Sequence, residues 1–555
     1  MRISGFHGNT STLQTPFSSL KSRSHSARCS RFVVCSQDGA SQKKVIVVGG
    51  GWAGFGAAKA LSEQGYAVKI LDAAPAPGGV SAGWRTPSGR PVEAGTKGFW
   101  FQYPNIFSLL KELDNMPEWP LGPFETSGFW GPTGDLITEA PVFSQQPQLP
   151  ALIGQFVYTH PLFYGLPLID RLSILPWLFN VINLRASGET YERYDNMSAY
   201  ELFRLFGVTD KAYNLFLKPT LAVGLFAPPE QLSAASVLET LEFYALAHQN
   251  SFDVCWAKRS ISECIFEPLI EKIEAAGGEL KGGRLVTGID IDTTTGTVRS
   301  VVATNKETGN EEVYETDAVV LAISITGMQK LVSSTPELGS RLEFQKIMNL
   351  STIDCIATRI WFDRKIATRF PANVLADFEP DVGCTYFNLS HMQPDEFKND
   401  PGTVIAADFY GASSLLPLSD REILQKVQRN MALCEPAFAS AEIIDSAVLR
   451  FPKAVTHFSP GSYKNRPYQQ TSFPNVMLAG DYIKGLDHGA NGLSQERAYV
   501  TGLAAANLVM QQLGQGNPAE ILPVEADEGH IRAAKQVNKS VVNVLNSVGI
   551  RLPFL

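Results

Sequence analysis

The pattern of apolar and polar positions near the start of the chain predicts a strand, a turn, a helix and a second strand. Residues 45–48 are all β-branched and apolar, as expected for a buried strand. The glycine-rich residues 49–54 follow, and small and apolar residues continue to Leu61 as a helix would. A second apolar run, residues 67–71, ends in Asp72. This order predicts a βαβ unit of the kind that binds dinucleotides.

The glycines of this turn have the spacing G-x-G-x-x-G that is typical of dinucleotide sites. Gly49 permits the tight turn, Gly51 presents no side chain to the pyrophosphate, and Gly54 lets the helix lie close to the sheet. The helix begins near Trp52 and Ala53, where free backbone N–H groups would face the phosphates. We therefore expect all five of these residues to bind the cofactor.

An acidic residue and a glycine pair after the second strand narrow the choice of nucleotide. Asp72 lies 23 residues after Gly49, close to the offset of roughly 20 residues at which a carboxylate binds the ribose. Gly78 and Gly79 begin six positions after Asp72. Such a pair resembles the large family of FAD-dependent oxidoreductases that includes amine oxidases, protoporphyrinogen oxidases and carotenoid desaturases. FAD is therefore favoured over NAD, and the alternative is an ordinary Pro-Gly turn without a ligand.

Later segments return to the same fold. Residues 284–292 and 298–304 alternate as a hairpin, and residues 317–323 form a buried strand. In the FAD enzymes just named, such a stretch brings a backbone amide, here that of Val286, to the adenine; a sheet without ligand contact is the alternative. Residues 475–484 are typical of a strand that ends at a ligand, with Gly480 and Asp481 at its end, and a helix follows from about residue 494.

An apolar stretch, residues 149–184, comes near to the composition of a membrane segment. Asp170, Arg171 and four prolines interrupt it, so no transmembrane helix is expected. Two interpretations remain: a buried helical pair beneath a substrate cavity, or a surface that dips into one leaflet. Tyr158, Tyr164 and Trp177 are residue types that favour membrane interfaces.

Several ordered motifs resemble the plant-type carotene desaturases, which include phytoene and ζ-carotene desaturases. The motifs lie in residues 91–105, 194–203, 219–236 and 450–484, so the resemblance covers most of the mature chain. It implies an α/β fold, with a Rossmann-type FAD-binding domain of the glutathione-reductase-like kind and an interleaved α+β substrate domain. It also places Asp481 at the ribityl or phosphate side of the flavin. The helix that begins near Glu496 would direct its positive end at the isoalloxazine.

Three positions depart from the family's motifs where flavin and substrate would meet. Val80 replaces a basic residue, Lys97 replaces a histidine, and Arg497 occupies the place of a small residue. Lys97 and His488 are candidates for acid/base chemistry or for tuning the flavin. Glu496 would either cap its own helix or stabilise a cationic intermediate. Arg497 would crowd the flavin.

Composition limits the class of protein and suggests its location. A formal net charge of −8 without a basic stripe argues against nucleic-acid binding, and the seven cysteines show no metal-ligand spacing. Residues 1–35 are rich in Ser and basic residues and contain no acid, which is typical of a plastid transit peptide.

The domain assignment follows from these segments. We assign residues 1–40 to the transit peptide, residues 41–115, 260–330 and 471–515 to the FAD domain, residues 116–259 and 331–470 to the substrate domain, and residues 516–555 to a helical tail. The leading hypothesis is a plastid FAD-dependent desaturase that takes hydride from an apolar carotenoid or isoprenoid and passes electrons to a membrane quinone, with peripheral membrane contact. The alternatives are a flavin-dependent carotenoid isomerase, a non-catalytic flavin- or carotenoid-binding protein, and a porphyrinogen or amine oxidase.

Overall fold

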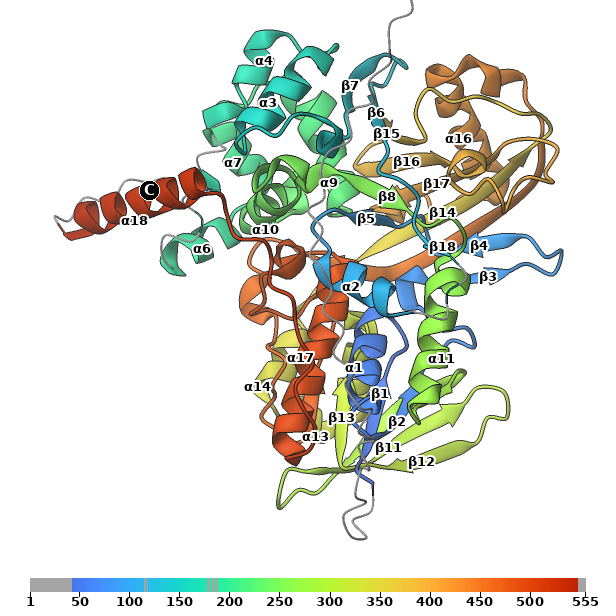
Figure 1. Ribbon diagram of the computed structural model, residues 1–555, viewed down its shortest axis with the longest axis vertical. Helices are drawn as coiled ribbons and strands as arrows, with labels where there is room; N and C mark the ends of the chain where they lie inside the picture. The colour runs from blue at the N-terminus through green and yellow to red at the C-terminus, as the bar shows by residue number, and fades with distance from the viewer. Residues whose placement is uncertain are drawn as a thin grey trace, which may run out of the picture. The chain divides into compact units, whose positions relative to one another are not determined.

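A computed structural model describes residues 42–547, apart from residues 114–115, 117, 177–179, 182–183 and 185–187. The predicted transit peptide and Trp177 lie outside the described residues. Figure 1 shows the arrangement of the elements.

A five-stranded parallel sheet forms the first layer, in the order β19-β13-β1-β2-β9. Its strands are β1 (Lys44–Val48), β2 (Ala67–Leu71), β9 (Glu279–Lys281), β13 (Ala318–Leu321) and β19 (Val476–Leu478). They come from three separate stretches of the chain. Strand β1 lies between β2 and β13 and is buried on both faces, which explains why its residues are apolar throughout.

Helices cover one face of this sheet and a smaller sheet covers the other. Alternate strand residues pack with α1 (Trp52–Ser62), α11 (Glu267–Ala275) and α17 (Gln495–Leu513). The opposite face packs on α12 (Ile325–Ser334) and on an antiparallel sheet of β10 (Arg284–Ile291), β11 (Val298–Asn305) and β12 (Glu311–Glu315). This is a Rossmann-type fold, and the βαβ unit and the hairpin predicted from the sequence are present.

A seven-stranded sheet has the order β18-β14-β17-β16-β15-β6-β7. Its strands are β6 (Ser127–Trp130), β7 (Leu136–Ala140), β14 (Ser351–Phe362), β15 (Ala372–Glu379), β16 (Val382–Asn388), β17 (Val404–Tyr410) and β18 (Ile443–His457). One face packs on α16 (Asp420–Cys434), and the other packs on β4 (Pro91–Glu93) and β8 (Val254–Trp256). Residues 127–140 and 351–457 therefore meet in one sheet.

Helical elements complete the molecule. A separate hydrophobic cluster joins α6 (Gly188–Asp195), α7 (Ala199–Leu205), α9 (Lys218–Gly224) and α10 (Ala234–Leu241). The short elements α3 (Ile153–Thr159) and α4 (Leu168–Leu172) lie in the apolar stretch, and β3 (Gly83–Arg85), β5 (Gly98–Trp100) and α2 (Pro104–Glu112) lead from the sheet of β1 toward the sheet of β14.

The C-terminal tail corrects one expectation. Among the described residues of the tail, 516–547, only α18 (Gly529–Ser547) is helical, and residues 516–528 contain neither helix nor strand. These residues instead run back along the molecule, where the backbone N–H of Leu522 donates to the side chain of Asn105 at 2.8 Å. Gly514, which ends α17 in the left-handed conformation, and Pro518 soon after it explain why the helix does not continue.

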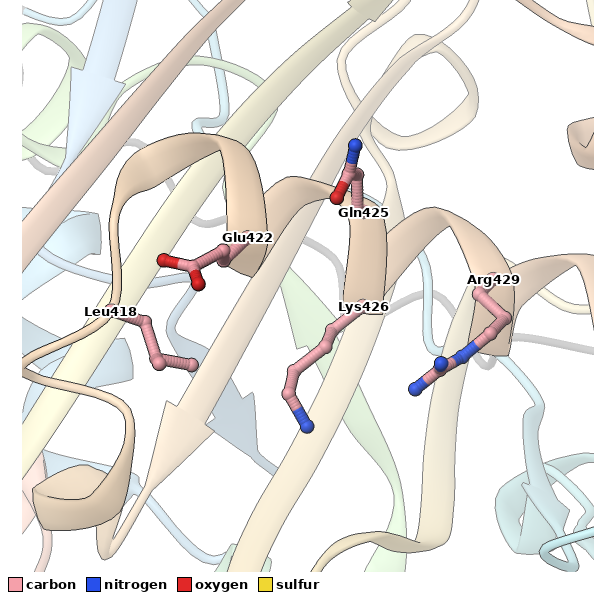
Figure 2. A pocket seen from close by; sticks show the side chains of 5 residues that line it. All are labelled: Leu418, Glu422, Gln425, Lys426 and Arg429. Carbon is pink, nitrogen blue, oxygen red and sulfur yellow. The ribbon is translucent and has the colours of Figure 1, made fainter.

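A surface hollow of about 310 Å³ lies beside α16 (Figure 2). Leu418, Glu422, Gln425, Lys426 and Arg429 line it. Because α16 packs on the sheet face opposite β4, this hollow is separated by the seven-stranded sheet from the residues that the sequence singled out. It does not belong to the site described next.

Candidate flavin site

The glycine turn after β1 leaves an open space in front of one glycine. A Cβ on Gly49 would lie 2.4 Å from the carbonyl oxygen of Ala322, and a Cβ on Gly54 would lie 1.8 Å from that of Gly49. These two glycines are needed by the fold itself. A Cβ on Gly51 would approach other atoms no closer than 3.9 Å, at Gly78 and Gly79. The room for a phosphate group therefore lies at Gly51.

The N-terminus of α1 points its donors into that space. Gly51 is the N-cap residue of α1, and no side chain caps the helix there. The N–H groups of Trp52, Ala53 and Gly54 belong to the first turn, which has no carbonyl partners within a helix. A diphosphate would supply the missing acceptors and the favourable negative charge.

Asp72 is fixed beside this turn at the end of β2. One carboxylate oxygen accepts a hydrogen bond from the N–H of Gly50 at 2.6 Å, and the other accepts one from Ala74 at 2.7 Å. Each oxygen keeps acceptor capacity for a ribose hydroxyl. The backbone oxygen of Asp72 also accepts from the N–H of Arg284 on β10 at 2.7 Å. Val286 follows two residues later, so the predicted adenine contact lies on the strand that adjoins Asp72.

The third stretch meets the first through α17. Gly480 and Asp481 follow β19, and the N–H of Gly480 donates to the hydroxyl of Thr501 at 2.9 Å. A Cβ on Gly502 would lie 2.0 Å from the carbonyl oxygen of Ala53, so the backbones of α1 and α17 touch. The structure therefore brings the glycine turn, Asp72 and the Gly480–Asp481 turn to one edge of the parallel sheet, and this arrangement fits a dinucleotide.

Trp52 joins the two helix starts through contacts that the sequence did not reveal. Its indole N–H is within reach of the side-chain oxygen of Gln495 at 3.0 Å and the hydroxyl of Ser81 at 3.2 Å. The amide of Gln495 donates in turn to the carbonyl of Gly98 at 2.9 Å. The side chain of Trp52 is therefore a structural bridge, and only its backbone is directed to the phosphate space.

Arg497 does not crowd the flavin space, contrary to expectation. The guanidinium is fully buried and donates to the carbonyls of Asp481 (3.0 Å), Leu486 (2.6 Å) and His488 (2.9 Å), and also to that of Ile483. Because its donors are used by the loop of residues 481–488, it holds that loop in shape. Burial and a neighbouring arginine lower the pKa of Arg497 to about 9.

A second arginine that the sequence did not single out holds the same loop. Arg466 is buried and donates to the carbonyls of Tyr482 at 2.8 Å and Ile483 at 3.3 Å. Its guanidinium also lies 5.0 Å from the ring of Phe458. Arg466 lies in a motif that resembles the desaturases, so the sequence pointed to this position. It did not indicate that two buried arginines donate hydrogen bonds to the same loop.

His488 lies in this loop, with its side chain largely buried. Its Nε2 lies 2.8 Å from the carbonyl oxygen of Leu522, which belongs to the returning C-terminal segment. Burial lowers the pKa of His488. The imidazole thus tethers residues 516–528 to the loop, and its proposed acid/base role rests on Nδ1 alone, which has no hydrogen-bond partner among the described residues.

Glu496 has neither of the two roles that we expected, the cap of its own helix or the stabilisation of a cationic intermediate. The cap of its own helix is Ser494, whose hydroxyl accepts from the N–H of Arg497 at 3.3 Å. The Glu496 carboxylate instead accepts from the backbone N–H (2.9 Å) and side-chain amide (2.7 Å) of Asn105, and from the N–H of Ile106 (2.9 Å). It thereby caps α2 and has no exposed surface. Its carboxylate is structural, so it is not placed to stabilise a cationic intermediate.

Stability is expected to depend on pH through Glu496. Burial raises its pKa from about 4.5 to about 7, so the folded state holds the proton more tightly than the unfolded state. The free energy of unfolding should therefore fall, by up to about 3 kcal/mol, as the pH rises through this interval. In Glu496→Gln this part of the pH dependence should vanish, as measured by urea unfolding at pH 5 and pH 8. Equal pH slopes for both proteins would contradict this role.

Lys97 lies between the flavin space and the seven-stranded sheet. It follows β4, and its ammonium donates to the carbonyls of Ala94 at 3.1 Å and Gly95 at 3.0 Å. Burial lowers the pKa of Lys97, and the charges of Asp408 and Glu93 oppose that shift. The next residue, Gly98, is the one that Gln495 binds, so Lys97 lies beside the junction of α1 and α17.

Comparison with known proteins agrees with this geometry. The chain is 24% identical over 488 residues to the 15-cis-phytoene desaturase of Solanum lycopersicum, covering 84% of this chain and 78% of that protein. It is 27% identical over 495 residues to the carotenoid phi-ring synthase of Streptomyces griseus, covering 85% and 88%. The resemblance to carotene desaturases is confirmed at this low identity.

A solved structure supports the same fold. The cyclohexylamine oxidase from Brevibacterium oxydans IH-35A matches with a TM-score of 0.59 at 14% identity, over 85% of this chain and 100% of that one. Residues 52–510 match the family described as flavin containing amine oxidoreductase. The chain belongs to this family and is a flavin-dependent oxidoreductase.

Proposed function

We propose that the protein binds FAD and removes hydride from a long apolar isoprenoid or carotenoid. The observation that carries the proposal is the open space at Gly51, which lies at the N-terminus of α1 and faces Gly78 and Gly79, with Asp72 bound to the adjacent Gly50. The similarity to carotenoid desaturases supports the class of substrate. Asp72, with Val286 nearby, would bind the adenosine, residues 51–54 the diphosphate, and Gly480 and Asp481 the ribityl side.

FAD supplies the hydride acceptor when it is bound. The described residues position and enclose the reacting centre. Arg466 and Arg497 shape the loop after Asp481, and Gln495 ties the start of α17 to the strand that follows Lys97. The ammonium of Lys97 keeps one N–H donor available, because two of its three N–H groups are used by carbonyls.

An anaerobic reaction tests the proposed function. Purified protein loaded with FAD is mixed with a cis-polyene, either a hydrocarbon carotene or the same skeleton carrying a ketone, with and without a prenylated benzoquinone. We expect the flavin absorbance to bleach, a polyene with one more double bond to form, and the quinone to restore the absorbance. Isomer change that requires pre-reduced flavin would instead indicate a redox-neutral isomerase. A protein that binds no FAD would rule out both activities.

A plastid membrane is the proposed location, because the N-terminal composition and the chloroplast relative agree and an apolar surface is present. No helix among the described residues is long and apolar enough to cross a membrane. Between residues 153 and 175, however, large apolar side chains lie exposed in and around α3 and α4. These are Ile153, Phe156, Val157, Tyr164, Leu168, Ile169, Leu172 and Leu175. A concentration of exposed apolar side chains on two neighbouring helical elements in the sequence fits insertion into one leaflet.

Liposome flotation tests this membrane contact. Wild-type protein should float with vesicles of plastid lipid composition, and the double variant Ile153→Glu/Ile169→Glu should remain in the soluble fraction, because two charges would have to enter the leaflet. Leu342 on α14 (Leu342–Ile347) is 63% exposed, so Leu342→Glu is the matched control and should float as the wild type does. Flotation of the double variant at wild-type levels would count against the assignment.

A further inference from the structure

Lys97 presents a charged donor that the protein leaves partly unused. Among the described residues no carboxylate lies within 4.0 Å of its ammonium, and its hydrogen bonds go to the carbonyls of Ala94 and Gly95. An ammonium has three donors, so one remains. The side chain keeps part of its surface uncovered, although burial lowers its pKa. Both observations fit a side chain whose ammonium is neither fully packed nor fully hydrogen-bonded.

The nearest acids have other partners, although one carboxylate oxygen of Asp408 accepts no hydrogen bond among the described residues. Glu93 accepts from the N–H of Ile261 at 2.9 Å and lies 3.5 Å from Arg359. Asp408 accepts from the N–H of Thr96 at 2.6 Å and lies 3.7 Å from the same arginine. Their charges favour the protonated form of Lys97 from a distance, but they do not occupy its third donor.

The sheet face around Asp408 carries mainly apolar side chains, together with the polar residues Arg359 and Thr385. In the register of β14, β17 and β18, Ala357 lies opposite both Asp408 and Leu449, and Cys355 lies opposite Phe451. Leu449 and Phe451 are partly uncovered. Since partners directly across an antiparallel ladder share a face, these apolar side chains lie on the face that carries Asp408. Lys97 thus lies beside a mainly apolar surface, and the buried guanidinium of Arg359 is a second cation nearby.

A pure hydrocarbon would fit such a space poorly. It would displace water from the ammonium without giving it an acceptor, and burying an unpaired charged donor is costly. A ligand with a carbonyl or carboxylate oxygen at this place would pair with it. Sites built to hydrogen-bond a substrate group reject analogues that lack the group by factors of about 10⁴.

We propose that Lys97 determines specificity by binding an oxygen acceptor on the apolar chain, so that the substrate is an oxygenated polyene rather than a hydrocarbon carotene. This rests on the proposed function and names its substrate class. Lys97 pairs with the substrate oxygen and thereby fixes how far the chain enters the space beside the flavin site.

Ligand binding tests the proposal without turnover. Quenching of tryptophan fluorescence in FAD-loaded protein is used to compare a C40 hydrocarbon polyene with the same skeleton that carries a ketone. Wild-type protein should bind the ketone at least about 100-fold more tightly. Lys97→Met should bind the two within a few-fold of each other, and Lys330→Met, an exposed lysine on α12, should bind as the wild type does.

If Lys97→Met fails to fold, the two affinities of the wild-type protein still test the proposal, and equal affinities for the two ligands would overturn it.

Binding of a prenylated benzoquinone is measured as a third ligand. Loss of quinone binding alone in Lys97→Met would also overturn the proposal, because the acceptor oxygen would then belong to the oxidant. A change only in the flavin spectrum of Lys97→Met would assign its donor to the flavin, again against the proposal. Failure of the proposed function is distinct, since no polyene would then reduce the flavin.

Discussion

Replacement of Arg497 by methionine is expected to destabilise the flavin-free protein by about 4 kcal/mol or more and to abolish flavin binding. The guanidinium serves four carbonyls, of Asp481, Ile483, Leu486 and His488. Methionine fills similar volume but donates nothing, and each buried carbonyl left without a partner costs roughly 1–3 kcal/mol. Because the same loop begins at Gly480 and Asp481, its collapse would remove one of the three parts of the cofactor site.

Urea unfolding and flavin content after purification measure the effect of Arg497→Met. Arg497→Lys should be intermediate, because a lysine has three donors in place of five and no planar fork. Arg532→Met, at an exposed position on α18, is the control and should behave as the wild type does. If Arg497→Met kept its stability and bound flavin more tightly, the side chain would lie in the flavin space after all.

Local patterns were sufficient for the nucleotide-binding part of the fold. The second strand was predicted over residues 67–71, where β2 lies, and the hairpin and the strand after residue 317 correspond to β10, β11 and β13. Apolar periodicity and glycine spacing are local features of one βαβ unit, so they can be recognised in the sequence alone. Strands β15 and β16 were missed because their pairing is set by neighbours far along the chain.

The roles of individual charged side chains were the features that the sequence predicted least well. Glu496 binds Asn105, which lies 391 residues away, and nothing near residue 496 announces that contact. Arg497 was expected at the flavin because of its motif position, but the long loop of residues 485–492 gives its donors closer carbonyls. Lys97 was singled out by its motif position, whereas its free donor depends on Arg359, which lies near both acids and far along the chain.

Substitution of Gly51 by valine separates the fold from the cofactor. Gly51 has φ −104° and ψ −171°, a conformation that valine adopts readily, and a Cβ there meets no protein atom closer than 3.9 Å. Only the N-cap preference of α1 is lost, at a cost of about 1 kcal/mol. The two added methyl groups would, however, fill the space reserved for the diphosphate and cover the N–H groups of the first turn. Gly224→Val, at an exposed glycine with nothing within 4 Å, is the control.

Equilibrium titration of flavin-free protein with FAD therefore tests the assembled flavin site most directly. We predict that each wild-type chain binds one FAD and that Gly51→Val binds it at least about 100-fold more weakly, which corresponds to roughly 2.7 kcal/mol. Urea unfolding of the flavin-free variant should be nearly unchanged. Equal FAD affinity in wild type and Gly51→Val would contradict it, because the cofactor would then not lie at the glycine turn.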